Sequence, residues 1–154
     1  MEDWIITLEM ENRQLCKPAG KPMVIIFASW MPWKRSFFGL GPDDAVLLKT
    51  VATFDLSVWE FWSALTAGAR LVVATADGHQ DPDYLLGLLR DRNVTTLHTV
   101  PSMLSMLMTV AAGPLSPSLR RVLAIGEALP APVAQQFRQA NSAALYNLYG
   151  PTEA

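Results

Sequence analysis

The residues best suited to chemistry lie at the end of the chain, where positions 147–154 read Asn-Leu-Tyr-Gly-Pro-Thr-Glu-Ala. An amide, a phenol ring, a hydroxyl and a carboxylate stand close together around a Gly-Pro pair that favours a turn. Tyr149 could stack on a flat base, Thr152 could bind phosphate oxygens and Glu153 could hold a hard cation. For each residue taken alone, a polar turn without a binding role is the alternative.

A second candidate is Asp55, in the stretch 54–60 that reads Phe-Asp-Leu-Ser-Val-Trp-Glu. Ser57 followed three residues later by Glu60 is a capping box, which predicts a helix that begins at Val58. Asp55 then lies just before the helix, in the connection from the preceding strand. Its carboxylate could favour the positive end of the helix or pair with a cationic ligand, and both roles stay open.

This helix must position the side chains around Asp55. Its predicted apolar stripe consists of Val58, Phe61, Trp62 and Leu65, and Gly68 ends it. Trp59 falls off that stripe, so packing against a neighbouring strand is one interpretation of it.

The rest of the chain alternates strands with helices. Strands are predicted at 45–48, 70–74, 94–99, 121–125 and 144–146, and further helices from Pro82, Pro101 and Pro132. This order predicts an α/β fold of repeated βα units with right-handed crossovers and a largely parallel sheet. The loops after the strands, near Asp55, His98, Gly126 and Asn147, should gather at one edge and form a single site.

Composition restricts the possible partners. A chain of 154 residues that is 51% apolar and 17% charged can bury the core of one domain. Its net charge of −2 gives no support for nucleic acid or an anionic membrane as partner. Cys16 has no second cysteine to pair with, no apolar run reaches the length of a membrane span, and Glu2 and Asp3 disfavour a secretory signal. We therefore expect a cytoplasmic protein.

Three stretches, in order and spacing, resemble core motifs of the adenylate-forming enzymes, in the form found in adenylation domains of nonribosomal peptide synthetases. They are 54–60, the Gly-Glu-Ala-Leu-Pro run at 126–130 and the Asn-x-Tyr-Gly-Pro-Thr-Glu run at 147–153. The resemblance implies part of the large N-terminal subdomain of an enzyme that activates an amino acid with ATP and transfers it to a carrier-protein thiol. It covers residues 39–154, whereas residues 1–38 match poorly and keep only a degraded phosphate-loop remnant at 20–22.

The resemblance also implies roles for individual residues. Asp55 would bind the α-ammonium group of the amino acid, and the side-chain pocket would be lined by Trp59, His98, Leu123, Ile125 and Leu148. The nucleotide, ATP or AMP, would contact Gly126, Glu127, Asn147, Tyr149, Gly150 and Thr152. Glu153 would bind Mg²⁺, and the partner carrier domain would bear phosphopantetheine. Trp59, His98 and Leu123 resemble pockets that select serine, a small amino acid, although Ile125 stands where such pockets carry a small hydroxyl residue.

The family's ribose-binding aspartate motif, hinge and C-terminal catalytic lysine have no counterpart up to Ala154. Losing one donor to transition-state charge costs roughly 2.7–4 kcal/mol. We therefore expect a truncated adenylation domain that holds no catalytic residue of its own and is inactive alone. One alternative is a piece that becomes active when other segments join it. Another is a non-catalytic remnant or interaction module.

Overall fold

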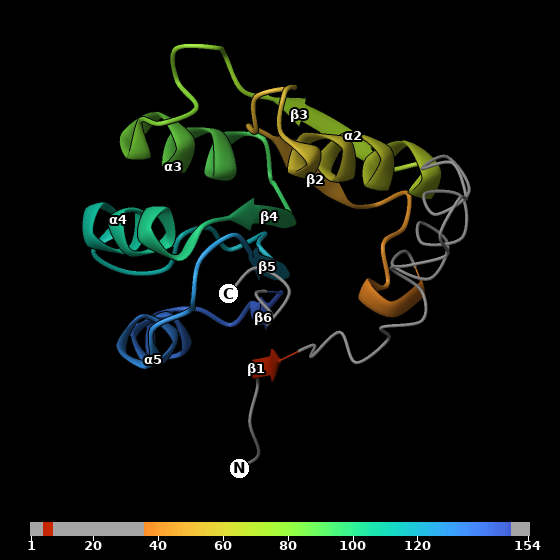
Figure 1. The fold of residues 1–154 in the computed structure, drawn as a ribbon. Coiled ribbons are helices and arrows are strands. Elements are labelled where there is room, and N and C mark those ends of the chain that lie inside the picture. The colour runs from red at the N-terminus through yellow and green to blue at the C-terminus, as the bar shows by residue number, and fades with distance from the viewer. Residues whose placement is uncertain (1–4, 8–35, 149–154) are drawn as a thin grey trace.

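A computed structural model describes residues 5–7 and 36–148, and residues 1–4, 8–35 and 149–154 lie outside the described part (Figure 1). Strands and helices alternate along the described chain, as predicted. The strands are β1 (Ile5–Thr7), β2 (Ala45–Leu48), β3 (Arg70–Val73), β4 (Thr96–Thr99), β5 (Arg121–Ala124) and β6 (Ala144–Asn147). The helices are α2 (Asp55–Ala67), α3 (Pro82–Asp91), α4 (Pro101–Ala111) and α5 (Ala131–Ala140).

The described strands form one sheet in the order β1-β6-β5-β4-β2-β3, and all of its pairs are parallel. The predicted α/β class with a parallel sheet is therefore confirmed. In a parallel sheet every strand ends at the same edge, so the loops after the strands are neighbours. The register places His98 of β4 beside Leu123 of β5, and Leu123 beside Tyr146 of β6.

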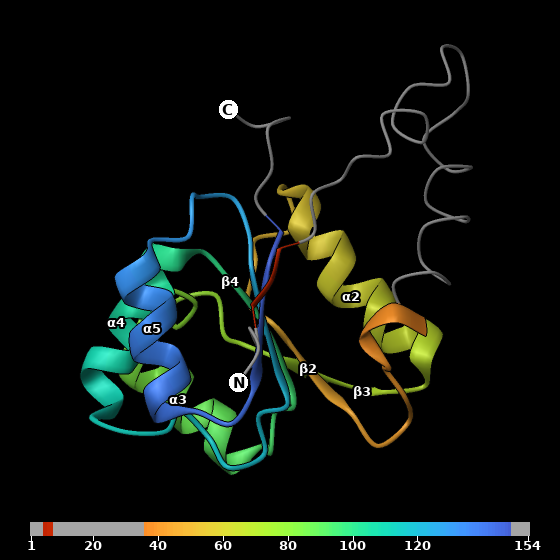
Figure 2. The same cartoon turned by 90° about the horizontal axis from the view of Figure 1, so that it is seen from below.

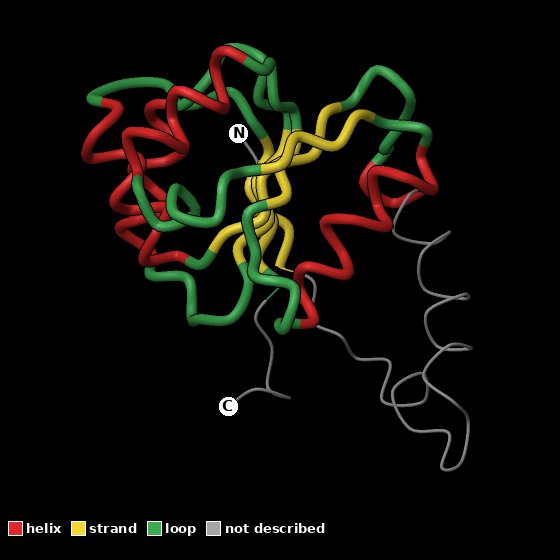
Figure 3. Tube along the Cα trace, turned by 90° about the horizontal axis from the view of Figure 1, so that it is seen from above, coloured by secondary structure: helices red, strands yellow, loops and turns green. Residues whose placement is uncertain are grey.

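The two faces of the sheet are covered unequally. Helices α3, α4 and α5 lie on one face and α2 lies on the other (Figures 2 and 3). The three-helix face holds the larger core, which includes Leu85, Leu104, Leu107, Phe137 and Leu145. The α2 face holds a smaller cluster in which Trp59, Val46 and Leu123 are buried. Strands β2 and β5 are buried almost throughout, which explains the nearly continuous apolar runs that predicted these two strands.

Local signals define several helix ends. The Asp81 carboxylate accepts hydrogen bonds from the amides of Asp83 (3.0 Å) and Tyr84 (3.4 Å), so it caps α3 as predicted. Gly68 ends α2 with a left-handed φ of 68°, a conformation that favours glycine. Among the described residues, none of the helices has the length and apolar character needed to cross a membrane.

The start of α2 differs from the prediction. The helix begins at Asp55, with Phe54 in the N-cap position, so Asp55 is its first residue and does not lie in the preceding connection. Ser57 donates from Oγ to the Phe54 carbonyl at 2.7 Å and forms no capping box. The Glu60 carboxylate points to the loop after β2, where it accepts from the amides of Lys49 (3.1 Å) and Thr50 (2.9 Å). These loop amides need an acceptor, and the buried carboxylate supplies it.

The predicted apolar stripe of α2 was also assigned to the wrong face. Phe61, Trp62 and Leu65 are 39%, 46% and 48% exposed, whereas Trp59 and Ala64 are buried against the sheet. Because α2 carries large apolar side chains around most of its circumference, hydrophobic pattern alone does not identify its inner face. Small residues on the inner side let the helix approach the strands closely.

At the amino ends of the strands, Asp44 contacts the segments that precede β2 and β4 and the first residue of β5. Its carboxylate accepts from Thr95 Oγ1 (2.6 Å) and the Gly41 amide (3.0 Å), and it pairs with Arg121 Nη1 (3.1 Å). Burial alone would raise the pKa of Asp44, but the hydrogen bonds from Thr95 and Gly41 and the charge of Arg121 hold it below the ordinary value. This cluster braces the amino ends of these strands, and its Arg121 also donates from Nη1 to Thr96 Oγ1 at 3.0 Å.

Candidate functional site

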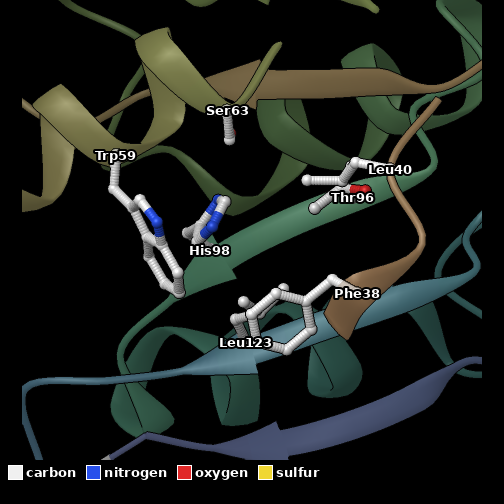
Figure 4. Close-up of a pocket in the computed structure, with 7 residues that line it drawn as sticks. All are labelled: Phe38, Leu40, Trp59, Ser63, Thr96, His98 and Leu123. Atoms are coloured by element: carbon white, nitrogen blue, oxygen red, sulfur yellow. The ribbon is translucent and has the colours of Figure 1, made fainter. Parts of the chain in front are cut away.

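A small cavity lies between α2 and the strands β4 and β5 (Figure 4). Its volume is about 10 Å³, close to the least space that holds one water molecule. Helix α2 and strand β4 each contribute two lining side chains, and the rest come from β5 and from the segment before β2. The lining residues are Phe38, Leu40, Trp59, Ser63, Thr96, His98 and Leu123. The sequence-predicted residues Trp59, His98 and Leu123 therefore lie together.

Aromatic rings form one wall of this cavity. The indole of Trp59 lies over the imidazole of His98, with 4.9 Å between ring centroids. Phe38 meets Trp59 at 5.9 Å and Tyr146 at 5.0 Å, both edge to face. Such contacts fix the position of each ring. Any group that enters the cavity therefore meets a preformed surface of flat side chains.

Hydroxyl groups supply the polar part of the lining. Ser63 Oγ donates to the Glu60 carbonyl at 3.2 Å, and Thr96 Oγ1 accepts from Arg121 Nη1 at 3.0 Å. A hydroxyl oxygen has two lone pairs, so Ser63 can donate to the helix and still accept from another group. The cavity thus combines apolar walls with acceptors for a small polar group.

The remaining predicted substrate residues are Asp55, Leu148 and Ile125, of which the last two do not line this cavity. Asp55 begins α2 four residues before Trp59, which places both positions on one face of the helix. Leu148 packs against the same apolar cluster as Trp59 and Leu123. Ile125 follows β5 and is half-buried, and its amide donates to the Thr99 carbonyl at 3.1 Å. The seven lining residues include neither Leu148 nor Ile125.

Two predicted nucleotide residues lie in the loop after β5. Gly126 has a φ of +83°, a backbone conformation that side chains disfavour. The Glu127 carboxylate accepts from the Ser102 amide (3.0 Å) and from Ser102 Oγ (2.9 Å). Because apolar Val100 occupies the N-cap position of α4, Glu127 supplies the cap from a different loop. Its carboxylate therefore has a structural partner within the protein.

The other nucleotide and metal candidates are only partly described. Asn147 is the last residue of β6 and is paired in register with Ala124 of β5, so it lies beside the start of the Gly126 loop. Tyr149, Gly150, Thr152 and Glu153 lie outside the described residues. Within the described part of the chain, no group of three or more acidic, histidine or cysteine side chains could hold a metal ion.

The loop that leads into α2 is held by a buried carboxylate. Glu60 is 0% exposed and also accepts from Thr50 Oγ1 at 2.8 Å. Burial raises the pKa of Glu60, although the hydrogen bonds from Thr50 and the charge of Lys49 oppose the shift. Burial lowers the pKa of Lys49, and the Glu60 charge opposes that change. The loop after β2 is thereby fixed to the middle of α2.

Sequence reasoning missed four of the lining residues. Ser63 follows Trp59 by one helical turn, and Thr96 precedes His98 by two strand positions. The helical and strand repeats therefore place each of them on the same face as a residue that was predicted. Phe38 and Leu40 belong to the segment before β2, and no local sequence pattern there predicts a contact with α2. Only the tertiary structure brings them to the cavity.

Comparison with known proteins connects this geometry to a family. A family model described as AMP-binding enzyme matches residues 23–154. Tyrocidine synthase 3 of Brevibacillus parabrevis is 47% identical over 123 residues, which cover 80% of this chain and 2% of that protein. The chain therefore belongs to the AMP-binding enzyme family.

Solved structures give the same assignment. The nonribosomal peptide synthetase FmoA3 in its AMPPNP-bound form is 27% identical with a TM-score of 0.74, over 81% of this chain and 14% of that one. The adenylation domain AlmE of Vibrio cholerae, in complex with glycyl-adenosine-5'-phosphate, is 32% identical with a TM-score of 0.69, over 81% of this chain and 24% of that one. The chain corresponds to part of a nonribosomal peptide synthetase adenylation domain, and it spans less than a quarter of these relatives.

Proposed function

We propose that this chain carries the amino-acid pocket and part of the nucleotide site of a domain that activates an amino acid as its aminoacyl-adenylate. One observation carries the proposal: Trp59 of α2, His98 of β4 and Leu123 of β5 line one cavity. Three side chains that are distant in sequence converge there, in a fold shared with a domain solved with glycyl-adenosine-5'-phosphate. Asp55, at the start of α2, would bind the α-ammonium group of the amino acid.

The nucleotide would lie along the carboxyl edge of β5 and β6. Gly126 and Asn147 are supported by their places at the ends of adjacent strands, and AMPPNP binding by FmoA3 supports an adenine nucleotide. Glu127 would line the opposite wall while its carboxylate caps α4. We assign Tyr149, Gly150 and Thr152 to the nucleotide and Glu153 to Mg²⁺. A phosphopantetheine thiol on a carrier domain would accept the activated amino acid.

The substrate would be a small amino acid, with serine as the specific proposal. A cavity of about 10 Å³ is close to the least space that holds one water molecule, which favours a small side chain, and Trp59 and His98 close one side of it. Ser63 offers a hydroxyl oxygen that can accept from a substrate hydroxyl. The neighbouring Ile125 and Leu148 would complete the apolar surround.

Alone, the chain would not adenylate amino acids at a useful rate, because the family's catalytic lysine has no counterpart in it. A second candidate function is an interaction module derived from such a domain. The exposed side chains of Phe61, Trp62 and Leu65 on α2 favour that candidate, because contiguous apolar surface marks interaction sites.

Binding and turnover can be tested separately. Pyrophosphate exchange by the purified chain, assayed with each common amino acid, should not exceed that of a Glu153→Gln control. Calorimetry should nevertheless detect binding of a stable sulfamoyl analogue of seryl-adenylate. Trp59→Ala should abolish this binding, whereas Trp62→Ala, which truncates an exposed tryptophan of the same helix, should preserve it.

Several outcomes would contradict the proposal. Clear exchange above the control would show that the chain is catalytically complete enough to work alone. Equal affinities of the folded Trp59→Ala and Trp62→Ala variants would show that the ligand does not bind in the cavity. Absence of binding by the unaltered chain would favour the interaction module.

A further inference from the structure

Glu60 is a buried carboxylate that directly follows Trp59 of the cavity wall. All three of its side-chain hydrogen bonds reach the loop after β2: to the Lys49 amide (3.1 Å), the Thr50 amide (2.9 Å) and Thr50 Oγ1 (2.8 Å). Hydrogen bonds to an ionised acceptor are stronger than neutral ones. The middle of α2 is therefore fastened to the carboxyl end of β2.

Besides Trp59, the buried side chains on the inner side of α2 are small, namely Ser57, Ser63, Ala64 and Ala67. The ring of Trp59 packs against those of His98 and Phe38 and is the large contact on that side. The polar attachment at Glu60, the next residue along the helix, adds a second fixed point between α2 and the strands.

The attachment belongs to a closed circuit of contacts around the cavity. Glu60 joins α2 to β2, and β2 pairs with β4 through Val46 and Thr96. Strand β4 carries His98, whose ring lies 4.9 Å from that of Trp59 on α2. A shift of the helix relative to β2 would therefore change the distance between the two rings that form the cavity wall.

We propose that Glu60 is a positioning residue for the amino-acid pocket, which holds Trp59 against His98 by anchoring α2 to the Lys49–Thr50 turn. Glu60 itself does not line the cavity and acts through the helix. The effect on ligand binding rests on the proposed function, whereas the effect on the two rings does not. These two consequences can be measured independently.

The test compares Glu60→Ala with Glu60→Gln in the 154-residue chain. Alanine removes the acceptor for all three hydrogen bonds. Glutamine keeps an oxygen for the two amides and can donate to Thr50 Oγ1, so it should restore the attachment. Asp81→Ala is the matched control, because it removes a carboxylate that accepts two amide hydrogen bonds at the start of α3, on the other face of the sheet (Figure 2).

The first readout is the proton NMR signal of the His98 ring, which depends on the ring current of Trp59. His79 is the other histidine of the chain and serves as an internal reference. The second readout is the affinity for the seryl-adenylate analogue. Glu60→Ala should move the His98 signals and weaken binding about tenfold to a hundredfold, as expected for displaced binding groups. Glu60→Gln and Asp81→Ala should leave both readouts near those of the unaltered chain.

Unchanged His98 signals in a folded Glu60→Ala variant would overturn the proposal, and so would equal shifts in Asp81→Ala. If Glu60→Ala fails to fold, Thr50→Val removes only the bond to Thr50 Oγ1 and should move the His98 signals in the same direction; no movement there would also overturn it. If the unaltered chain does not bind the analogue but the His98 signals respond, the positioning role holds and the proposed function fails.

Discussion

Replacing Asp44 by alanine should destabilise the folded chain more than most single substitutions do. The side chain is 2% exposed, and it accepts hydrogen bonds from Thr95 Oγ1 (2.6 Å) and the Gly41 amide (3.0 Å). Arg121, whose side chain is only 10% exposed, would lose the carboxylate 3.1 Å from its Nη1 atom. Removing one partner of a buried ion pair costs about 3–5 kcal/mol. That is a large part of the roughly 5–15 kcal/mol that stabilises an ordinary domain.

Urea denaturation at pH 7, followed by circular dichroism, measures this loss. The alanine variant should unfold at lower urea with an unchanged slope, because the folded structure still buries the same surface. Asp44→Asn keeps an oxygen acceptor and removes the charge, so its loss should be smaller, about 1–3 kcal/mol. A matched control is Asp77→Ala, which alters an exposed aspartate and should change the free energy of unfolding little.

The pH dependence follows from the lowered pKa of Asp44. Because the carboxylate of the folded state titrates below the ordinary value of about 3.9, its stabilising contribution is complete above about pH 5. The contribution is lost as the pH falls below about 4 and through the folded-state pKa. The stability difference between the unaltered chain and Asp44→Asn should therefore shrink in acid. A difference below about 1 kcal/mol for Asp44→Ala at pH 7, or one for Asp44→Asn that does not shrink in acid, would refute this reasoning.

Two further predictions concern α2. Because burial raises the folded-state pKa of Glu60 above its unfolded value of about 4.3, the folded state retains its proton longer, and Glu60 should make stability fall as the pH rises through that interval. Urea titrations across that interval should show this decline in the unaltered chain and not in Glu60→Gln, and identical profiles would contradict it. If Asp55 binds the substrate ammonium, Asp55→Ala in a full-length adenylation domain that contains this segment should abolish amino-acid-dependent pyrophosphate exchange, since losing one partner of a buried charge pair costs about 3–5 kcal/mol. Unchanged exchange would leave Asp55 with a role at the helix terminus only.

Local sequence signals predicted most of the fold. The apolar run at 45–48 became β2 with the same bounds, and Asp81-Pro82 marked the start of α3. These predictions succeeded because each depends on a few neighbouring residues, such as a carboxylate that caps its own helix. The order of strands and helices then determined the parallel sheet.

The predictions that failed depended on contacts between distant segments. The capping box predicted from Ser57 and Glu60 does not form, because the Glu60 carboxylate accepts hydrogen bonds from the Lys49 and Thr50 amides instead. The apolar character of α2 extends over both faces, so the choice of its inner face depended on the fit of Ala64 and Trp59 to the sheet. Tertiary packing decides both questions, and a local pattern does not encode it.

The same distinction applies to the candidate site. Trp59, His98 and Leu123 were brought together by motif resemblance, and the structure places all three at one cavity. Phe38 and Leu40 escaped prediction because the segment before β2 reaches the cavity only in the folded chain. The Ser102 contacts of Glu127 were likewise not predicted, because they join the loop after β5 to the first turn of α4, 25 residues away in the sequence.

The most direct test of an amino-acid pocket between α2 and the sheet is an NMR titration of the chain with the stable seryl-adenylate analogue. The chain contains its own controls, because His98 and Trp59 line the cavity while His79 lies in another loop and Trp62 is exposed on the outer side of α2. The account predicts that the ring signals of His98 and Trp59 shift as the ligand binds, and that those of His79 and Trp62 do not. Shifts confined to His79 or Trp62, or no shift at saturating ligand, would contradict it.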